Sequence, residues 1–471
     1  MAFIGLLLGE QLDFPGEEYQ RLSPVDSSSL RPWTEVVPGV LDPLITQLKT
    51  LNLSAEADLK ARSAALLQLA SDLERDAASL ARLITMENGC PMAQSEGLQV
   101  QSAVALIRSL VEQASEFAFT EERVGARGGK VRIDRLPIGI ALGIVPCNVP
   151  IFLACLKLAT ALLAGCPVVL KPSPENVDSM ALFSRYLARM DLPTGAVNLI
   201  LGGRVLGDHL VRNDVFRKVS FTGSSASGLA VAQLCAQRFA RVTLELGGKS
   251  SAILLDDIDF TEVKDQLWLA MLQNNGQVCG AQSRVLIPKS RAPELRSALS
   301  EMFEETVVGD PRSPETGIGP VVTAEAANRI RNTCNEATSQ GALLLSGTRE
   351  EPQESATVPP RLYEVQDSVA EIWNEELFGP VACLRVYETE DEAVGWANQS
   401  RYGLSGSIWS SDTNRALRAA QRLETGTVAV NSKKILDFVA PFGGWGQSGI
   451  GRELGDEGFR SYLETKTILL P

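Results

Sequence analysis

Residues 138–173 read IGIALGIVPCNVPIFLACLKLATALLAGCPVVLKPS, and this stretch predicts the fold class more directly than any other. It contains an apolar strand at 138–146, an apolar helix from Pro150 to Leu163 and a second strand at 167–173. Two strands joined by one crossover helix are expected to pair in parallel. The stretch therefore predicts an open parallel sheet covered by helices.

The same alternation continues toward the C-terminus. We expect strands at 196–202, 218–224 and 242–248, with helices at 176–190 and 227–238. A second alternation begins at 251–257 and runs to about residue 440, which makes the chain an α/β protein. Open sheets of this kind bind ligands at the carboxyl ends of their strands, so residues just after the strands are candidate site residues.

The flanking segments differ from this pattern. Residues 3–40 predict a peripheral hairpin and loop, and 53–87 a long amphipathic helix that stops at Asn88–Gly89. Residues 122–136 predict a hairpin around Gly128–Gly129. The chain ends in an alternating strand, RSYLETKTILLP, with little to pair with locally. Two such exposed strands predict pairing between subunits, and hence a homodimer or homotetramer.

Composition excludes several classes of partner. The net charge of −13 disfavours nucleic-acid binding, which needs a basic surface. No apolar run approaches the ~20 residues that are needed to span a bilayer. The N-terminus lacks the positive region of a signal peptide, and its apolar run ends too early, at Glu10. We therefore expect a cytoplasmic protein without a membrane partner. The eight cysteines form no C-x-x-C pair, which favours neither a disulfide network nor a metal site.

The segment NNGQVCGAQSR (274–284) places Cys279 among glycines and amides. From these residues alone, Cys279 is a packing residue, a metal ligand, half of a disulfide or a nucleophile. The chain has one histidine, His209, in what we expect to be an ordinary surface helix. If Cys279 is a nucleophile, its proton acceptor is therefore expected to be a carboxylate.

Polar residues at two strand ends each have a functional and a structural interpretation. Asn148 follows the strand at 138–146, where its amide can donate to a developing oxyanion or satisfy local backbone in a turn. Lys171 ends the next strand, where it can hold a ribose hydroxyl or a phosphate, or simply be solvated.

Two further strand ends carry candidates. FTGSSASG (221–228) can bring backbone N–H groups to a pyrophosphate at a helix N-terminus, or form a turn in which serine caps the helix. Glu245 lies in the apolar strand of LELGGK (244–249), so it is either a general base with a raised pKa or the ion-pair partner of Lys249. Glu376 and Phe378 lie in NEELFGPV (374–381), just before another strand, and mean little alone.

Together these segments resemble the aldehyde dehydrogenase superfamily, nearly from end to end. The matching blocks occur in order along the chain: PCNVP, LKPS, FTGS, LELGGK, GQVC, EELFGPV and PFGGWGQSGIGRE. The resemblance implies an aldehyde-dehydrogenase-like α/β fold, with a Rossmann-type cofactor domain, an α/β catalytic domain and a small β oligomerisation element. We expect the cofactor domain at 1–121 and 138–247, the catalytic domain at 248–445, and oligomerisation strands at 122–137 and 456–471.

The resemblance also implies the roles of the site residues. Cys279 is expected to be the nucleophile, Glu245 the base that activates water, and Asn148 an oxyanion donor together with the backbone N–H of Cys279. Cofactor contacts are expected from Lys171, which would hold the adenosine ribose, from Glu376 at the nicotinamide ribose, from Phe378 beside the nicotinamide, and from Ser173, Pro174, Gly223, Ser224, Gly228 and Leu246.

The implied reaction is the oxidation of an aldehyde to the carboxylic acid with NAD or NADP. A thiolate attacks the aldehyde to give a thiohemiacetal, hydride transfer leaves a thioester, and water activated by Glu245 releases the acid. No metal is required. Glu245 favours hydrolysis over transfer of the acyl group to coenzyme A. The alternatives are coenzyme-A-dependent oxidation, a catalytically silent structural or binding member of the fold, and a thiol hydrolase that acts on esters.

This chain departs from the family pattern at several positions. Cys147 and Val149 flank Asn148 where Trp and Phe are common, and Trp445 replaces a lysine. Pro174 stands where many members have a glutamate that selects NAD, with Glu175 beside it. NAD or NADP is therefore open, with NAD slightly favoured.

The expected substrate is a small-molecule aldehyde. Lys433 and Lys434 fall where the entrance loop of the family lies, and Gln273 adds polarity. They suggest an acidic semialdehyde, and the alternative is that both lysines are solvated loop residues, as lysine usually is.

Overall fold

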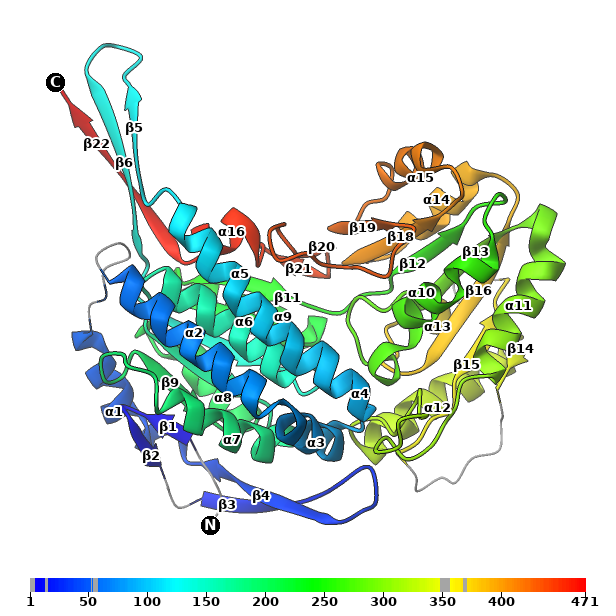
Figure 1. Ribbon diagram of the computed structural model, residues 1–471, viewed down its shortest axis with the longest axis horizontal. Helices are drawn as coiled ribbons and strands as arrows, with labels where there is room; N and C mark the ends of the chain where they lie inside the picture. The colour runs from blue at the N-terminus through cyan, green and yellow to red at the C-terminus, as the bar shows by residue number, and fades with distance from the viewer. Residues whose placement is uncertain (1–4, 13–15, 52, 54–57, 348–355, 367–370) are drawn as a thin grey trace.

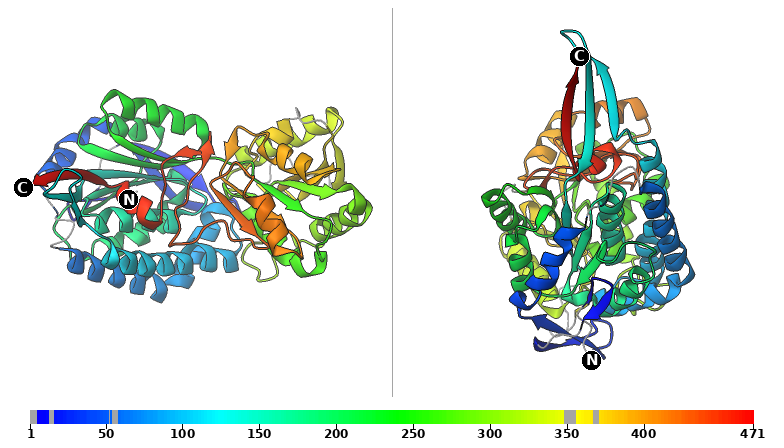
Figure 2. Two further views of the ribbon diagram at one scale, coloured as in Figure 1. Left: turned by 90° about the horizontal axis from the view of Figure 1, so that it is seen from above. Right: turned by 90° about the vertical axis from the view of Figure 1, so that its left-hand side faces the viewer.

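The computed structural model describes residues 5–12, 16–51, 53, 58–347, 356–366 and 371–471. Two helix-covered sheets lie side by side, and a narrow three-stranded sheet projects away from the first of them (Figure 1). Figure 2 shows the same division from above and shows the projecting strands standing clear of the body. The fold class is the predicted α/β architecture.

The first sheet has eight strands in the order β2-β1-β9-β8-β7-β10-β11-β21. Its five central strands are parallel. They are β7 (Ile140–Val145), β8 (Val168–Pro172), β9 (Val197–Ile200), β10 (Phe216–Thr222) and β11 (Arg241–Glu245). Antiparallel strands complete both edges, namely β1 (Gly5–Leu7) with β2 (Glu10–Leu12) at one and β21 (Gly449–Ile450) at the other.

Helices cover both faces of this sheet and build two cores. One core contains residues of α2 (Leu59–Arg75), α3 (Ala77–Asn88), α5 (Ser102–Glu116), α6 (Pro150–Leu163) and α7 (Val177–Leu187). The other contains residues of α1 (Asp42–Gln47), α8 (Arg204–Arg212) and α9 (Ser225–Gln237). The predicted alternation from 138 to 248 is therefore confirmed, because each strand and helix falls within a few residues of its expected range.

The second sheet has seven strands in the order β14-β15-β16-β13-β12-β18-β19, and all neighbours but β14 and β15 are parallel. The strands are β12 (Ser251–Leu254), β13 (Arg284–Pro288), β14 (Leu343–Ser346), β15 (Arg361–Glu364), β16 (Val381–Tyr387), β18 (Ser405–Trp409) and β19 (Thr427–Val430). One core holds α10 (Phe260–Leu272) and α11 (Ala292–Glu304). The other holds α12 (Ala324–Ser339), α13 (Glu371–Asn374), α14 (Glu390–Asn398) and α15 (Thr413–Ala420).

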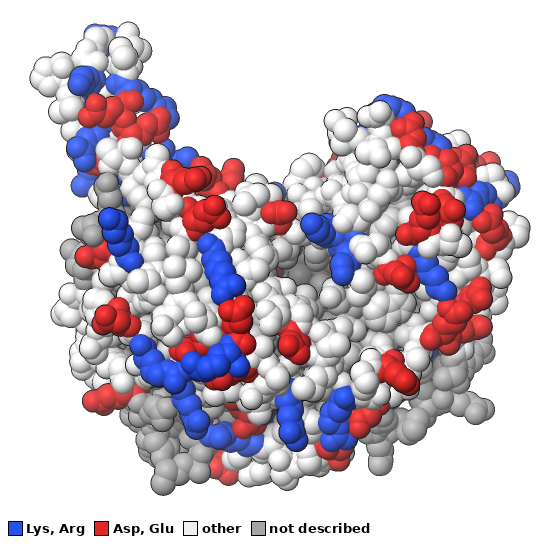
Figure 3. Space-filling model, in the orientation of Figure 1, with Lys and Arg blue, Asp and Glu red and all other residues white. Residues whose placement is uncertain are grey.

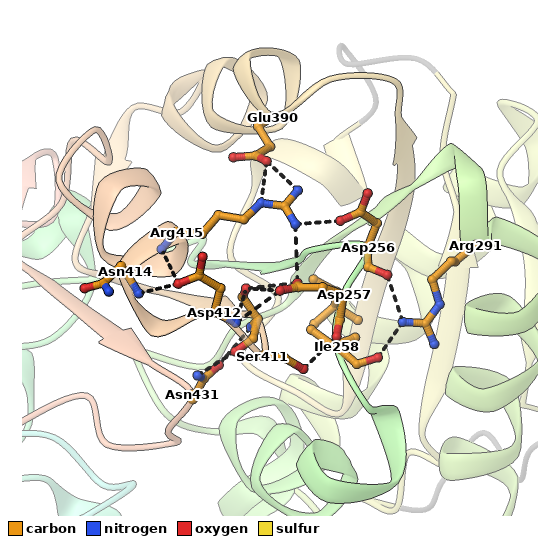
Figure 4. Close-up of polar contacts among 12 residues, drawn as sticks. Asp256, Asp257, Ile258, Arg291, Glu390, Ser411, Asp412, Asn414, Arg415 and Asn431 are labelled. Carbon is orange, nitrogen blue, oxygen red and sulfur yellow. Dashed lines mark hydrogen bonds and ion pairs between the residues drawn. The ribbon is translucent and has the colours of Figure 1, made fainter.

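A polar network joins helices α14 and α15 to the strand ends of the second sheet (Figure 4). Arg415 contacts Asp256 at 2.6 Å and also Glu390, and it lies 3.5 Å from Asp257. Asn431 donates from Nδ2 to Ser410 O at 2.8 Å, and its Oδ1 accepts from Ser410 N at 2.9 Å. Asn431 has a positive φ of 50°, so the chain leaves β19 in a turn that this contact fixes.

The projecting sheet is made of β5 (Thr120–Val124), β6 (Lys130–Pro137) and β22 (Leu463–Leu470). The predicted hairpin around Gly128–Gly129 is confirmed, since both glycines have the positive φ that this turn requires. The C-terminal strand, which was expected to have little to pair with locally, pairs with a distant segment of the chain. β22 pairs antiparallel with β6, from Leu463 opposite Pro137 to Leu470 opposite Lys130. The pairing joins segments too far apart in the sequence for local pattern to reveal it.

The segment predicted as one helix from 53 to 87 forms two helices, α2 and α3, although residues 54–57 lie outside the described part. The break is at Asp76, whose φ of −102° and ψ of 18° are not helical. Its carboxylate accepts a 2.7 Å hydrogen bond from the Tyr186 hydroxyl and pairs with Arg75 at 3.0 Å. Asn88–Gly89 does stop the second helix, with Gly89 as a left-handed cap.

The remaining elements are short. They are β3 (Gly16–Leu22), β4 (Ser29–Val36), α4 (Met92–Gln94), the π-helix η3 (Ser95–Gln101), β17 (Tyr402–Gly403), β20 (Trp445–Gly446) and α16 (Gly455–Arg460). In the described residues no helix has the length and hydropathy to cross a membrane. On the face drawn in Figure 3, lysine and arginine side chains alternate with aspartate and glutamate.

Candidate active site

The carboxyl edge of the first sheet gathers four of the predicted site segments. Strand order places β8, β7, β10 and β11 next to one another, all parallel. Lys171, Asn148, Ser224 and Glu245 therefore lie at or just beyond the same edge, each on a neighbouring strand. This is the edge at which open parallel sheets bind ligands.

Cys279 lies on a tightly held loop between α10 and β13. The loop begins with η5 (Gln273–Gly276), in which Asn274, Asn275 and Gly276 have φ values of 54°, 59° and 72°. Asparagine and glycine tolerate this left-handed conformation better than other residues do. A Cβ on Gly276 would overlap the backbone oxygen of Gly379, so a side chain cannot be accommodated there. The loop therefore approaches the 376–381 segment directly.

Asn148 is bound to the loop that carries Cys279. Its Nδ2 donates a 2.8 Å hydrogen bond to Gln277 O, and the residue is buried. The interpretation of Asn148 as a turn residue that satisfies only local backbone is therefore wrong, because its partner lies 129 positions away in the sequence. Gln277 is two residues before Cys279, so the amide and the thiol belong to one site.

Glu245 is a buried carboxylate, 3% exposed, at the end of β11. Neither oxygen has a hydrogen-bond partner within the described residues. A Cβ on Gly443 would lie 2.7 Å from Glu245 Oε1, which places the glycine-rich segment 441–451 against this carboxylate. Burial, and then the nearby Glu453, raise the pKa of Glu245 well above its ordinary value.

The ion-pair interpretation of Glu245 fails for the partner proposed from sequence. Lys249 is buried, and the groups that shift its pKa are Cys383, Arg284, Glu376 and Cys334 rather than Glu245. Lys157 and Arg452 are the cations that act on the pKa of Glu245, and Lys157 is already paired with Glu453 at 2.7 Å and donates to Ser220 Oγ at 2.9 Å.

The Cys279 thiol is surrounded by negative charge. Burial raises its pKa to about 12, and the carboxylates of Glu376 and Glu245 add to the shift. Both carboxylates are thus close enough to act on the sulfur electrostatically. All eight cysteines are free, and no cluster of potential metal ligands occurs in the described part of the chain. The sole histidine, His209, lies on α8 and contacts Asp42 at 2.7 Å.

Lys171 is buried rather than solvated, with 7% exposure, so its interpretation as a solvated strand-end lysine is wrong. Burial lowers its pKa to about 8, and Glu175 and Glu35 oppose that shift. Glu35 comes from β4 and accepts from Gly203 N at 2.8 Å and Leu206 N at 3.1 Å, at the start of α8. Sequence reasoning missed Glu35, because only the tertiary fold brings β4 to this edge.

The glycine-rich turn after β10 packs closely on the next strand. Ser224 Oγ caps α9 by accepting from Ser227 N at 3.3 Å, so the capping interpretation is confirmed. A Cβ on Gly228 would overlap the side chain of Leu246, which is buried. Gly223 precedes the cap and is half-buried. The N-terminus of α9 is thereby held beside Leu246, next to Glu245.

Glu376 approaches the same region from the second sheet. Its Oε1 accepts from Gly248 N at 3.1 Å, and a Cβ on Gly247 would overlap its carboxylate. Burial raises the pKa of Glu376 to about 7, while Gly248 and Lys249 oppose the shift. Phe378, two residues after Glu376, has a φ of 56°.

The segment after Lys171 forms a 3-10 turn that begins at Pro174. The Ser173 hydroxyl donates a hydrogen bond to the Glu175 carboxylate there.

The comparison with known families agrees with this geometry. The model described as "Aldehyde dehydrogenase family" matches residues 49–468. The chain belongs to the aldehyde dehydrogenase family. The predicted family, fold class and enzyme class are thereby confirmed.

Three relatives illustrate the similarity of this aldehyde dehydrogenase to known members. Geranial dehydrogenase of Castellaniella defragrans is 37% identical over 416 residues, 88% of this chain and 87% of that protein. A 3-succinoylsemialdehyde-pyridine dehydrogenase of a Pseudomonas species is 37% identical over 396 residues, 83% of this chain and 82% of that protein. A Mycobacterium tuberculosis aldehyde dehydrogenase, solved with NAD+, has a TM-score of 0.95 and 30% identity, and the match covers 100% of this chain and 98% of that one.

Residues 431–438, which the resemblance placed at the entrance loop of the family, bring an apolar side chain against the loop that carries Cys279. Leu436, Phe438 and Cys279 all pack against the same core, and a Cβ on Gly280 would lie 2.5 Å from Ile435 Cδ1. The rings of Phe438 and Phe152 lie 6.2 Å apart. Lys433 is half-buried, Lys434 is exposed and Gln273 is half-buried. Sequence reasoning singled out the lysines and missed this apolar face.

Proposed function

We propose that this protein oxidises an aldehyde to the carboxylic acid, with Cys279 as nucleophile, Glu245 as base and Asn148 as oxyanion donor. The observation that carries the proposal is the convergence at one sheet edge of three features. A buried carboxylate, whose two oxygens have no hydrogen-bond partner among the residues that the structure describes, lies near the thiol. A side-chain amide is bound to the loop that carries the thiol.

The thiol must lose its proton before it attacks. With a pKa raised to about 12, Cys279 is almost fully protonated near neutral pH. The raised pKa of Glu245 makes its ionised form a stronger base than an exposed glutamate, so it is suited to accept that proton. Attack by sulfur on the carbonyl carbon then forms a carbon–sulfur bond, and the carbonyl oxygen becomes an oxyanion.

Asn148 stabilises the developing charge. One N–H of its amide is used by Gln277 O at 2.8 Å, which leaves the second N–H for an oxyanion. Removing one such donor in other enzymes lowers kcat by roughly 10²–10³-fold, because the site is preorganised and excludes water. When bound, the nicotinamide ring supplies the acceptor for the hydride.

Release of the product depends on Glu245. The acyl group remains on the Cys279 sulfur as a thioester, which water must cleave. The proton that Glu245 took from the thiol first passes to solvent. Glu245 then takes a proton from the water as its oxygen attacks the acyl carbon, the carbon–sulfur bond breaks, and the departing Cys279 thiolate takes that proton back from Glu245. Gly443 lies against the carboxylate and has no side chain to block the approach of water.

The residues at the sheet edge fit a nicotinamide dinucleotide. Lys171 supplies a buried cation, the α9 N-terminus at Ser224 supplies free backbone N–H groups, and Glu376 supplies a carboxylate for ribose hydroxyls. Close packing of Gly228 on Leu246 holds the helix against the sheet. The NAD+-bound relative supports the same assignment.

The same geometry supports NAD over NADP. Two carboxylates, Glu35 and Glu175, lie near enough to Lys171 to act on its pKa. Many family members have a cofactor-selecting glutamate at the position of Pro174, and Glu35 and Glu175 supply negative charge there instead. They would repel the 2′-phosphate of NADP. We therefore propose NAD as the preferred cofactor.

The substrate side supports an aldehyde with an apolar chain better than an acidic one. Ile435 packs against Gly280, next to Cys279, and Phe438 of the same segment lies near Phe152, so we propose that this apolar segment lines the path to Cys279. The acidic semialdehyde suggested by Lys433 and Lys434 stays a prediction, and the names of the relatives favour neither class. Phe438→Ala should lower kcat/KM for octanal more than for succinic semialdehyde, whereas Lys433→Ala and Lys434→Ala should not discriminate. A selective loss for succinic semialdehyde in the lysine variants would instead support the acidic substrate.

Three further expectations stay proposals. We propose that 1–121 with 138–247 bind the cofactor and that 248–445 carry the chemistry. We propose that 122–137 and 456–471 join subunits into a homodimer or homotetramer. A cytoplasmic location remains a prediction from the sequence.

A panel assay tests the function. NADH and NADPH formation is measured with aliphatic, aromatic and carboxylated aldehydes, with and without coenzyme A. We expect NADH formation without coenzyme A and its loss in Cys279→Ser. Cys166→Ser is the matched control, because a serine hydroxyl can donate to Tyr462 O, 3.3 Å from the Cys166 sulfur.

Each alternative predicts a different result in this assay. Product formed only with coenzyme A would indicate an acylating enzyme. Ester cleavage without cofactor reduction would indicate a thiol hydrolase, and no turnover of any substrate would indicate a silent member of the fold.

A further inference from the structure

The backbone oxygen of Asn148 accepts hydrogen bonds from three buried side-chain amides. Asn88 Nδ2 lies at 3.1 Å, Gln99 Nε2 at 2.9 Å and Asn274 Nδ2 at 3.0 Å. All three donors are 0% exposed and come from three different segments of the chain. A carbonyl oxygen has two lone pairs, so three donors occupy it fully.

The preceding carbonyl is held in the same way. Cys147 O accepts from Asn88 Nδ2 and from Asn176 Nδ2, each at 3.3 Å. Two carbonyl oxygens of the turn between β7 and α6 are therefore fixed by side-chain amides. In a buried site of low dielectric such bonds are stronger than in water, and they restrict rotation of the Asn148 peptide.

Gln99 is the donor whose placement is hardest to explain by stability alone. It lies near the end of the π-helix η3 (Ser95–Gln101), an uncommon geometry that often marks functional sites. Its Oε1 is buried and has no hydrogen-bond partner within the described residues. An unpartnered buried oxygen is destabilising, whereas an apolar side chain of the same size would avoid that cost. The contact that the amide does make is with Asn148.

We infer that Gln99, supported by Asn88, is a positioning residue for the oxyanion donor Asn148. The inference rests on the proposed function, in which the second N–H of the Asn148 amide points at the developing oxyanion. The Asn148 side chain has only two rotatable bonds beyond its backbone, so the orientation of that peptide sets where the N–H points. A misplacement of about 1 Å can cost roughly 10²-fold in rate.

Gln99→Met removes the N–H and keeps nearly the same length. We expect kcat for aldehyde oxidation to fall roughly 10-fold or more while KM changes less than about 3-fold, because the interaction with the oxyanion is made in the transition state. Asn148→Ala should lower kcat by roughly 10²-fold. In the Asn148→Ala background, Gln99→Met should have less than about a 2-fold further effect, because Gln99 acts through Asn148.

A second readout separates positioning from general disruption of the loop. Alkylation of Cys279 by iodoacetamide requires the thiolate but develops no carbonyl oxyanion. Gln99→Met should therefore leave the alkylation rate within about 2-fold of the wild type. Asn198→Leu is the matched control for loss of a buried amide, since Asn198 Nδ2 donates to Gly195 O at 2.8 Å on β9, away from the site. It should lower the melting temperature and leave kcat unchanged.

Distinct outcomes separate the inference from the function on which it rests. If Gln99→Met lowers kcat equally in both backgrounds, or slows alkylation in parallel, its role is structural and the inference is wrong. If Asn148→Ala alone leaves kcat unchanged, the oxyanion assignment itself is wrong. If Gln99→Met does not fold, Gln99→Asn provides the same test, because it keeps a buried amide but shortens it by one methylene.

Discussion

At the scale of single residues, the most consequential feature is a nucleophile in an environment that suppresses its ionisation. Burial is the main cause of the raised pKa of the Cys279 thiol, and the carboxylates of Glu376 and Glu245 add to it. A group that is charged only when deprotonated is less ionised at a given pH when its pKa is raised. The thiol should therefore react slowly with electrophiles in the free protein.

The pH dependence of alkylation tests this. The rate of iodoacetamide labelling of Cys279 should rise roughly tenfold per pH unit from pH 7 to 10, because the thiolate fraction grows throughout this range when the pKa is about 12. Labelling is followed by peptide mass spectrometry. A plateau near the ordinary thiol pKa of about 8.5 would show that the local field does not act as described.

Glu35 gives a second prediction at this scale. Glu35→Gln removes one negative charge near Lys171 and keeps an acceptor for the α8 N–H groups. The ratio of kcat/KM for NADP to that for NAD should rise about 5- to 10-fold, which corresponds to roughly 1 kcal/mol of relieved repulsion. Glu74→Gln on the exposed surface of α2 is the control. An unchanged ratio would show that Glu35 does not contribute to the choice between NAD and NADP.

The contrast between Glu245 and Gln99 shows which site residues can be predicted from the sequence. A carboxylate in an apolar strand, an asparagine after a strand and a lysine at a strand end are visible in the linear pattern, because strand ends converge at one edge. Gln99 and Glu35 carry no such signal. Each acts through a contact made across the fold, 49 positions from Asn148 in one case and 168 from Gly203 in the other.

At the scale of elements, Arg21 is one of the residues that anchor the β3–β4 hairpin. Arg21 contacts Glu87 at 3.1 Å and the backbone oxygen of Glu175, and it lies 3.5 Å from Asp178. The Arg21 and Glu87 side chains are 9% and 1% exposed, so neither is well solvated. The hairpin that supplies Glu35 is thus tied to α3 and to the segment after Lys171.

Arg21→Met should therefore destabilise the protein by about 3–5 kcal/mol, because Glu87 would be left as a buried, unpaired carboxylate. Urea denaturation monitored by fluorescence measures the change. Adding Glu87→Gln to the variant should recover part of the loss, because the unpaired charge is then gone. Equal stability of Arg21→Met and the wild type would mean that the pair contributes nothing.

Local patterns predicted most helices and strands but not their interruptions. The periodicity of 53–87 runs through Asp76 without a break, yet the chain bends there because Tyr186 and Arg75 hold the carboxylate. Likewise, β22 reads as a strand without a partner because β6 lies more than 300 residues earlier. Both features depend on tertiary partners that periodicity does not reveal.

At the scale of the whole molecule, the three-stranded sheet is the least enclosed part of the protein (Figure 1). Leu469 on β22 is 76% exposed and Val124 on β5 is 90% exposed. Apolar side chains on a projecting sheet are suited to contact another subunit. The proposed assembly therefore places this sheet in the interface.

Leu469→Glu should weaken that assembly. In size-exclusion chromatography with light scattering, the wild type should elute as a dimer or tetramer and the variant should shift toward the mass of one chain at low concentration. Leu417→Glu, at a 49% exposed leucine on α15, is the matched control and should leave the mass unchanged. A monomeric wild type, or an unchanged Leu469→Glu, would exclude this role for the sheet.

The central claim is that an acyl group is held covalently on Cys279 until Glu245 activates water. Intact-protein mass spectrometry of Glu245→Gln tests it most directly, after prolonged incubation with octanal and NAD+ at pH 9, where the Cys279 thiol can lose its proton to hydroxide instead of to Glu245. We predict a mass increase of one octanoyl group, located by peptide mapping to the segment that contains Cys279, and a loss of steady-state turnover. An adduct on another residue, or undiminished turnover without any adduct, would contradict the account.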